Sequence, residues 1–293
     1  MADLQLDHLA TLIAVIEEGT FEAASQRLHV TASAVSQRIK SMEQSAGQVL
    51  VQLTNPIAPT EAGARLLRYA QQLELLRHDL DASLGAASTP SLAVAVNADS
   101  LATWLLPALA AAQDATGAVF DIYREDQEHT ASLLRAGTVM AAVTAEKRAV
   151  QGCSATQLGV MRYRAVATPI FQDRWLTGGL PDLDEAPMVD FDRKDDLQQS
   201  FLRGILGRAP RSPRHFVPTS HDFARAVELG MGWGMLPDQQ SQRGLGDGSL
   251  VELSPGTSLD VLLYWQRWNL ASPLLDELTR VVLDAAAEAL LRP

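Results

Sequence analysis

The chain has 293 residues, of which 47% are hydrophobic and 20% charged, and its formal net charge is −11. This balance is typical of a globular protein and excludes disorder, and the length favours two domains or three. The acidity argues against a nonspecific binder of polyanions but leaves room for a small nucleic-acid-binding module. No run of about 18 apolar residues occurs, so a membrane-spanning helix is excluded.

Several other classes of protein are excluded by what the sequence lacks. The first residues carry acids and no basic region, so we expect no secretory signal and a cytoplasmic protein. Cys153 is the only cysteine, so neither an intrachain disulfide nor a thiolate zinc site can form. There is no Gly-x-Gly-x-x-Gly run, P-loop lysine motif or Gly-x-Ser-x-Gly elbow, and the histidines are scattered. We therefore predict a protein that is not an enzyme and uses no cofactor and no metal.

The first part of the chain, up to about residue 58, predicts short helices without strands. Apolar residues recur at helical spacing before Gly19, which supplies a stop. Thr20 and Thr31 can cap a second and a third helix, and the third is expected to run to about Ala46. Three short helices joined by tight turns predict a helix-turn-helix unit.

Residues 60–84 predict one longer helix with a heptad repeat. Its apolar residues step by 4, 3, 4, 3 and 4, at Ala62, Leu66, Tyr69, Leu73, Leu76 and Leu80. We expect the stripe from Leu66 to Leu80 to form a dimer, because this helix joins two domains and has no obvious core of its own. The alternative is an amphipathic helix packed on its own domain.

A small-residue run from Gly85 to Pro90 marks the next boundary, and beyond it strands alternate with helices, which predicts a parallel sheet. The expected strands are 92–96, 119–123, 139–143, 188–191, 215–217, 232–236 and 261–265. The expected helices are 100–113, 130–135, 197–206, 223–229 and 272–291. Two similar α/β lobes predict a clamshell whose cleft binds a small ligand.

The third helix has a polar face that could enter the major groove of DNA. Val35, Ile39 and Met42 share one face, which must pack inward. The opposite face carries short hydroxyls, amides and cations: Ser33, Ser36, Gln37, Lys40 and Gln44, with Arg38 at the edge. Gln and Ser can read base edges, while Arg and Lys can reach phosphates or guanine. Taken alone, the pattern fits a solvated polar surface equally well.

This stretch resembles the LysR-type transcriptional regulators. The matching residues are Phe21 to Ala24, Leu28, Thr31 to Ile39, Glu43, Gly47 and Pro59 to Gly63. Within that family the chain is most similar to the branch that controls lysine and arginine export. The basis is the run Asn97 to Leu109, together with Leu263-Tyr264-Trp265. The resemblance spans essentially the whole chain.

The resemblance implies an α/β protein in three parts: a winged helix-turn-helix at 1–59, a linker dimerisation helix at 60–84, and an effector domain of two lobes, like the periplasmic binding proteins, at 85–293. It makes Thr31 to Gln44 the recognition helix and Gln48 to Pro59 the wing. It implies homodimers that pair into tetramers on double-stranded operator DNA; RNA polymerase is a further candidate partner. The DNA-binding residues are expected to be Arg27, Thr31, Ala32, Ser33, Ser36, Gln37, Arg38 and Lys40.

The expected wing departs from the family pattern. Leu53 and Ala58 stand where arginines are usual, and the first 84 residues hold six basic and ten acidic side chains, a net charge of −4. Fewer phosphate contacts predict weak nonspecific binding and a shallow dependence on salt. We therefore expect measurable DNA affinity only for the dimer or tetramer.

A second group of polar residues could line an amino-acid cleft. The run Asn97 to Ser100 follows a buried strand and opens a helix, whose free N–H groups could receive a ligand carboxylate. A cationic group would need carboxylates, and the acids at strand ends are Asp99, Glu125, Asp126, Asp190, Asp192 and Asp222. Each acid could instead cap a helix or lie in a solvated loop. We select as effector-binding residues Asn97, Asp99, Ser100, Thr103, Glu125, Thr144, Asp192 and His221. The resemblance points to L-lysine or L-arginine as the effector.

Three functions of different class remain. The first is a transcriptional regulator that responds to lysine or arginine and controls an amino-acid exporter or a related metabolic gene. The second is a solute-sensing module, which the absence of an export signal disfavours. The third is an architectural, chromosome-control DNA-binding protein that ignores amino acids, which the acidity of the chain disfavours.

Overall fold

Three short helices and a wing form the N-terminal domain, in a computed structural model that describes residues 5–86, 89–125 and 127–292. The elements are α1 (Leu6–Glu18), α2 (Phe21–Arg27), α3 (Ala32–Ala46) and the antiparallel strands β1 (Val51–Gln52) and β2 (Ala58–Pro59). Gly19 ends α1 with a φ of 71°, and the hydroxyls of Thr20 and Thr31 accept hydrogen bonds from the second and third helices. These predicted helix boundaries are confirmed.

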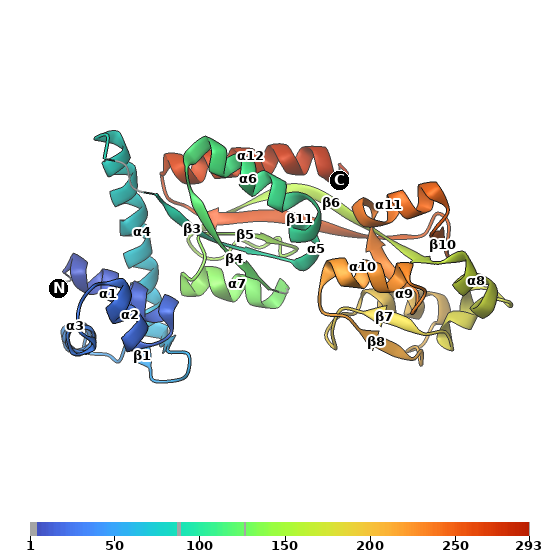
Figure 1. The fold of residues 1–293 in the computed structure, drawn as a ribbon, viewed down its shortest axis with the longest axis horizontal. Helices are drawn as coiled ribbons and strands as arrows, with labels where there is room; N and C mark the ends of the chain where they lie inside the picture. The colour runs from blue at the N-terminus through green and yellow to red at the C-terminus, as the bar shows by residue number, and fades with distance from the viewer. Residues whose placement is uncertain (1–4, 87–88, 126, 293) are drawn as a thin grey trace.

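Helix α4 (Glu61–Ser83) leads from the wing to the effector domain and belongs to the N-terminal core (Figure 1). Leu67 and Ala70 are each 1% exposed and lie in the same hydrophobic cluster as the core of α1. Gly63 brings α4 close to the wing, since a Cβ there would lie 1.9 Å from the carbonyl oxygen of Leu50. For this face of α4, packing on its own domain is confirmed.

The effector domain has two lobes, at the middle and right of Figure 1. Lobe I contains β3 (Ser91–Val96), α5 (Ala98–Ser100), η1 (Leu101–Leu105), α6 (Leu106–Thr116), β4 (Val119–Arg124), α7 (Gln127–Ala136), β5 (Ala141–Thr144) and α12 (Pro273–Ala289). Lobe II contains α8 (Pro169–Trp175), η2 (Leu180–Asp184), β7 (Met188–Asp190), α9 (Leu197–Leu206), β8 (Arg214–Phe216), α10 (Ser220–Glu228), β9 (Gly234–Pro237), α11 (Asp238–Asp247) and β10 (Val251–Glu252). None of the helices within the described ranges is both long and apolar enough to cross a membrane.

Two long strands, β6 (Cys153–Ala167) and β11 (Ser258–Trp268), connect the lobes (Figure 1). The main sheet has the order β10-β6-β11-β5-β3-β4, with β9 paired to β6. The predicted parallel pairing is right for β3 with β4 and β5, and for β7 with β8. It is wrong for the strands expected at 232–236 and 261–265, because β9 and β11 pair antiparallel with their neighbours. β6 and β10, which were not predicted, also pair antiparallel. The reason is that β11 returns the chain from lobe II to lobe I and so runs against β6.

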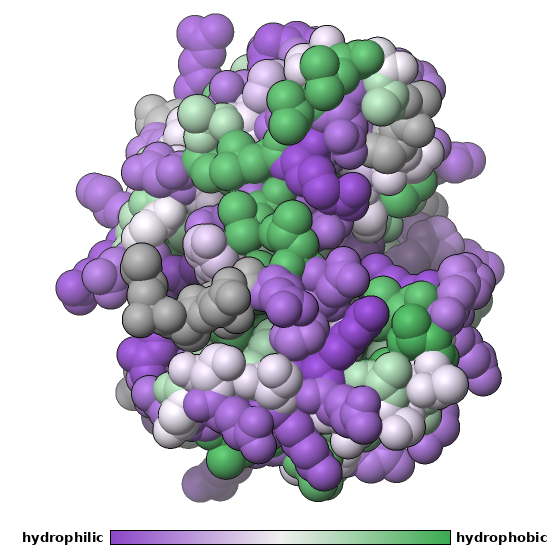
Figure 2. All heavy atoms as spheres, turned by 90° about the vertical axis from the view of Figure 1, so that its left-hand side faces the viewer, coloured by the Kyte–Doolittle hydropathy of each residue, from purple (hydrophilic) through white to green (hydrophobic). Residues whose placement is uncertain are grey.

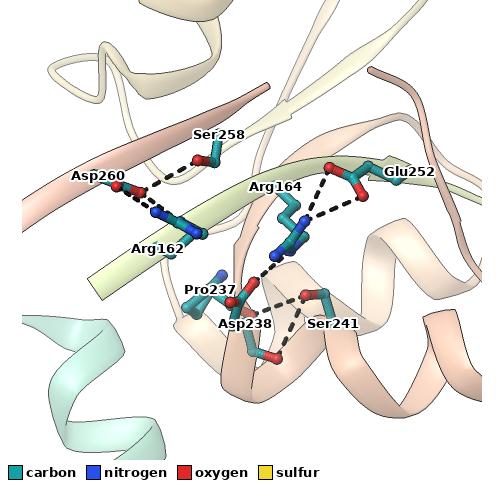
Figure 3. A network of polar contacts seen from close by, with 8 residues as sticks. All are labelled: Arg162, Arg164, Pro237, Asp238, Ser241, Glu252, Ser258 and Asp260. Atoms are coloured by element: carbon teal, nitrogen blue, oxygen red, sulfur yellow. Dashed lines mark hydrogen bonds and ion pairs between the residues drawn. The ribbon is translucent and has the colours of Figure 1, made fainter. Parts of the chain in front are cut away.

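Ion pairs fix these crossing strands to lobe II (Figure 3). Arg164 of β6 lies 2.6 Å from Asp238 at the start of α11 and 3.2 Å from Glu252 of β10. Arg162, two residues earlier, pairs with Asp260 of β11 at 2.7 Å. Arg164 and its two partners are partly buried, so the contact is less screened by water than an exposed pair.

The expected single helix over 100–113 is wrong in detail, because the chain forms α5, the π-helical turn η1 and α6 in succession. Pro107 explains the break. It has no N–H to donate to Thr103, and its ring crowds the preceding turn, so the hydrogen-bond register widens there.

The effector-domain core contains large aromatic side chains. Trp233, Trp265 and Trp268 are at most 1% exposed, and Trp104 is 4% exposed. All four belong to one hydrophobic cluster.

Replacing Gly63 by alanine is expected to destabilise the N-terminal domain by about 1–3 kcal/mol, because the added methyl group overlaps the Leu50 carbonyl. The first tryptophan is Trp104, so tryptophan fluorescence reports on the effector domain. Denaturant unfolding followed by far-ultraviolet circular dichroism should show an early transition that fluorescence does not.

Gly204→Ala is the matched control, because a Cβ at this position of α9 meets no atom within 4 Å. It is expected to stabilise the effector domain by about 0.5–1 kcal/mol. If Gly63→Ala unfolds at the wild-type denaturant concentration by both probes, the close packing of α4 on the wing is not real.

Candidate functional site

Helix α3 presents a polar face because its apolar face is fixed in the N-terminal core. Val35, Ile39 and Met42 are 0%, 2% and 1% exposed. The backbone N–H of Leu50 donates to Glu43 Oε1 at 2.9 Å, which ties the end of α3 to the start of the wing. The polar face of α3 therefore has a set orientation relative to the wing.

The residues selected for DNA contact do not all lie free on this face. Ser33, Gln37 and Lys40 are exposed, as is Thr31 at the helix cap, and Ala32 and Ser36 are half-buried. Arg38 is 27% exposed in its side chain and donates to Thr11 Oγ1 of α1 at 3.1 Å, so it braces the helix pair.

Arg27 lies on α2 and is engaged within the protein. Its guanidinium lies 2.5 Å from Glu17 and 3.3 Å from Glu18, both at the end of α1. The structure thus pairs Arg27 with acids of α1. On the wing, Leu53 is 79% exposed, in the position where the family pattern would suggest an arginine.

A second polar site is a cavity of about 860 Å³ between the lobes, within the range of small-molecule sites. It opens at the carboxyl ends of β3, β4 and β7, the edge at which α/β sheets bind ligands. Its polar lining residues are Asn97, Asp99, Arg124, Glu125, Tyr163, Asp192, Lys194, Asp195, Asp196, Gln198, Ser200 and Gln240. Five carboxylates face two cations, so the cavity favours a positively charged ligand.

Asp99 ties the two lobes together across this cavity. Its carboxylate accepts hydrogen bonds from the hydroxyls of Tyr163 on β6 and Ser220 at the start of α10, both at 2.7 Å. The Nε2 of Gln240 donates to Ser220 Oγ at 2.9 Å. Removal from water raises the pKa of Asp99 above its usual value, and the two hydroxyl donors offset part of that rise.

Arg124 makes the second polar contact between the lobes. It ends β4 in lobe I, and its Nη1 donates to the carbonyl of Pro218 in lobe II at 3.1 Å. Its guanidinium also stacks over the ring of Phe191, 5.8 Å from the ring centre. Both contacts hold in place one of the two cations that line the cavity.

The structure brings together four of the eight selected effector residues: Asn97, Asp99, Glu125 and Asp192 line the cavity. The other four lie outside the lining. Ser100 is buried beneath it, and the Thr103 hydroxyl donates to the Asp99 carbonyl within its own helix at 2.6 Å. Thr144 is 2% exposed and accepts from the Glu146 N–H.

His221 also lies outside the lining, exposed on the solvent side of α10. Among the other acids considered, Asp190 is fully buried against Arg214, and its pKa is raised to about 6 by burial. Asp222 is exposed and bonded to Thr219. Asp126 lies outside the described residues, as do residues 87–88 of the predicted boundary run.

Sequence reasoning missed Tyr163, Gln198 and Gln240. Tyr163 lies on β6, which was not predicted, although Met161, Tyr163 and Ala165 alternate with two arginines as strand residues do. Gln198 is 1% exposed, and its Nε2 donates to the Val189 carbonyl at 2.9 Å. No local pattern marks the two glutamines, because α9 and α11 reach the cavity only in the folded lobe.

Helix α4 carries an exposed apolar stripe on the face opposite its buried one. Tyr69, Leu76 and Leu80 are 47%, 41% and 57% exposed, whereas Leu66 and Leu73 are partly covered by the N-terminal core. Figure 2 faces this end of the molecule and shows a broken band of hydrophobic side chains running from the top of the face toward its middle. The stripe thus has the exposure that a contact with a second copy requires.

Two family profiles match almost the whole chain. The bacterial regulatory helix-turn-helix protein of the lysR family matches residues 6–64, and the LysR substrate binding domain matches residues 85–287. The HTH-type transcriptional regulator LysG of Mycobacterium tuberculosis is 46% identical over 98% of this chain and 96% of its own.

Solved structures of two relatives share the fold. ArgP from M. tuberculosis matches with a TM-score of 0.86 and 44% identity, over 99% of this chain and 100% of that one. Full-length LysG from Corynebacterium glutamicum with bound effector Arg matches with a TM-score of 0.80 and 40% identity, over 99% and 100%. The resemblance noted from the sequence is therefore confirmed.

LysR-family proteins are transcriptional regulators rather than enzymes, and they bind DNA and form oligomers. Within the described ranges no group of three or more His, Cys, Asp or Glu side chains could hold a metal ion. The N-terminal helix-turn-helix, the long α4 and the two-lobed domain are the parts that such a regulator needs. This chain belongs to the LysR family of transcriptional regulators.

Proposed function

We propose that this regulator binds L-arginine or L-lysine between its lobes and thereby controls transcription of an amino-acid exporter or a related metabolic gene. The acidic lining of the interlobe cavity is the observation that carries the proposal. The relative from C. glutamicum, solved with arginine bound, supports the same ligand class.

The cavity offers a complementary partner for each charged group of a basic amino acid. Glu125 and Asp192 come from opposite lobes and would meet the cationic groups, while Arg124 would meet the α-carboxylate. A ligand that contacts both lobes binds the closed arrangement better than the open one and so shifts the population toward closure.

The exposed row on α3 would read the operator, and α4 would pair two copies. The side-chain amide of Gln37 could form two hydrogen bonds with adenine, and the ammonium group of Lys40 could reach a phosphate or guanine. A homodimer formed through α4 would place two recognition helices on one DNA, and pairing of dimers would give a tetramer. RNA polymerase is the partner through which bound regulator would act.

Replacing Glu125 by glutamine is expected to weaken arginine or lysine binding by about 1.5–3 kcal/mol, or roughly tenfold or more, because a charge-assisted hydrogen bond is lost. Isothermal titration calorimetry measures this directly. His221→Ala is the control, since His221 is near the cavity but outside its lining. If the wild-type protein gives no heat with either amino acid, the ligand assignment is wrong.

Replacing Gln37 by alanine is expected to cost about 1–3 kcal/mol in affinity for the operator and to relax base preference at one position. Lys40→Ala should weaken binding to all sequences and lower the slope of log K against log salt by about 1. The operator is found by footprinting DNA upstream of the protein's own gene, with and without arginine or lysine. Arg65→Ala, exposed on α4, is the control for loss of a charge.

Replacing Leu76 and Leu80 together by glutamate is expected to dissociate the dimer, because like charges would face each other in the proposed seam. Sedimentation equilibrium gives the mass of the species. Leu53→Glu, on the exposed wing, should leave the oligomeric state unchanged. A double variant that sediments like the wild type would show that the stripe is not the contact.

A further inference from the structure

Arg68 of α4 holds the end of helix α7 in the effector domain. Its Nη2 donates to the carbonyl of Leu134 at 2.8 Å and to that of Arg135, and its Nη1 donates to the Gln151 carbonyl at 3.3 Å. The carbonyls of Leu134 and Arg135 belong to the last turn of α7 and carry its partial negative charge. The N–H of Gly137 also donates to the Leu134 carbonyl, at 3.3 Å. A guanidinium from the linker helix therefore caps a helix of lobe I.

Two glycines, Gly137 and Gly152, leave room for Arg68 to approach α7. Gly137 follows α7 with a φ of 81°, and a Cβ there would lie 2.7 Å from both Cα and Cβ of Arg68. Gly152 lies on the other side, where a Cβ would be 3.7 Å from Nη1. A side chain at position 137 would push α4 and α7 apart.

On its other side, Arg68 is fixed to the DNA-binding domain. Leu67 and Ala70, beside it on α4, are each 1% exposed in the core shared with α1. Nearby, the two domains enclose a hollow of about 300 Å³, lined by Glu17 and Gln71 on one side and Tyr123 on the other. Arg68 thus connects α4 to α7 through hydrogen bonds, beside a part of the domain interface that is less tightly packed.

The opposite end of α7 adjoins the ligand cavity. The strand β4 ends at Arg124, and Arg124 and Glu125 both line the cavity just before α7 begins. Since a helix transmits a displacement along its axis with little compression, movement of this cavity wall would reach Arg68. Among the described residues, α7 and the Arg68 side chain lie between the cavity wall at Glu125 and the DNA-binding core.

We infer that Arg68 and Gly137 form the joint through which closure of the cavity repositions the DNA-binding domain. Arg68 is a positioning residue: it touches neither DNA nor ligand, and acts through α7. This inference rests on the proposed response to an amino acid. It assigns the coupling free energy between amino-acid binding and operator binding to the contact of Arg68 with α7.

Arg68→Gln tests the joint in the full-length protein, with Arg65→Gln as the control on the exposed side of the same helix. Calorimetry gives the affinity for arginine and for lysine, and a gel shift gives operator Kd with and without each amino acid. In the wild type the two Kd values should differ by a typical coupling factor, about 5- to 150-fold. In Arg68→Gln we expect wild-type amino-acid affinity but a Kd ratio near one, whereas Arg65→Gln keeps the wild-type ratio.

Gly137→Ala tests the same joint without removing a charge. Gly117→Ala is its control, because Gly117 also follows a helix, with a φ of 70°, but a Cβ there meets no atom within 4 Å. Both variants carry the same kind of backbone strain, and only Gly137→Ala displaces α4. We expect Gly137→Ala to lose the effect of the amino acid on operator Kd and Gly117→Ala to retain it.

The possible failures are distinguishable. If neither amino acid binds or alters operator Kd in the wild type, the proposed function falls and the joint falls with it. If the amino acid changes operator Kd in the wild type and changes it by the same factor in Arg68→Gln and Gly137→Ala, the proposed joint is wrong and the proposed function stands. Retained calorimetric binding in each variant shows that its effector domain is folded, so a lost response cannot be ascribed to unfolding of that domain.

Discussion

The burial of one face of α4 in the core of the DNA-binding domain is the contact on which the other functions of this helix depend. Leu67 and Ala70 are almost completely removed from water, and Gly63 lets the helix lie against the wing. With that face fixed, the remaining faces have set directions. Tyr69 and Leu80 point outward, and Arg68 meets α7. One helix therefore links the DNA-binding domain to the effector domain, and in the proposed dimer it would also link α3 to a second copy.

The lobes of the effector domain are joined by continuous strands but meet across the cavity through polar groups. Asp99 contacts Ser220, and Arg124 contacts Pro218, through single hydrogen bonds, whose net contribution to stability is modest. The ion pairs of Arg164 instead hold the crossing strand to lobe II. Two continuous strands beside a few hydrogen bonds can act as a hinge. A small ligand that binds one arrangement of the lobes more tightly shifts the population toward that arrangement.

Local chemistry made the N-terminal domain predictable, because hydroxyl caps and glycine stops determine helix ends within a few residues. The strand β6 was missed because Arg162 and Arg164 make its sequence look polar, although both are engaged in ion pairs.

The cavity was predictable only where strands end. Asp99 and Glu125 follow such ends, whereas Tyr163 and Gln240 arrive from distant segments. The effector residue predicted on α10 was His221, whereas its neighbour Ser220 contacts Asp99. Successive residues of a helix point about 100° apart, so an error of one residue changes which side chain faces the cavity.

The DNA-binding domain has few free cations, so its affinity for DNA would depend on the pairing of two copies. Arg27 and Arg38 are committed to contacts with α1, and the wing exposes Leu53 where a cation would grip a phosphate. The first 84 residues, with a net charge of −4, would therefore gain little from counterion release, and a single copy would depend on the proposed base contacts by residues such as Gln37. Two such domains held by the stripe on α4 would bind a double site at high effective concentration, which restores affinity without adding charge. In the proposed dimer the apolar stripe and the acidic DNA-binding domain would be complementary: pairing would supply affinity, and nonspecific attraction to the DNA backbone would not reduce specificity.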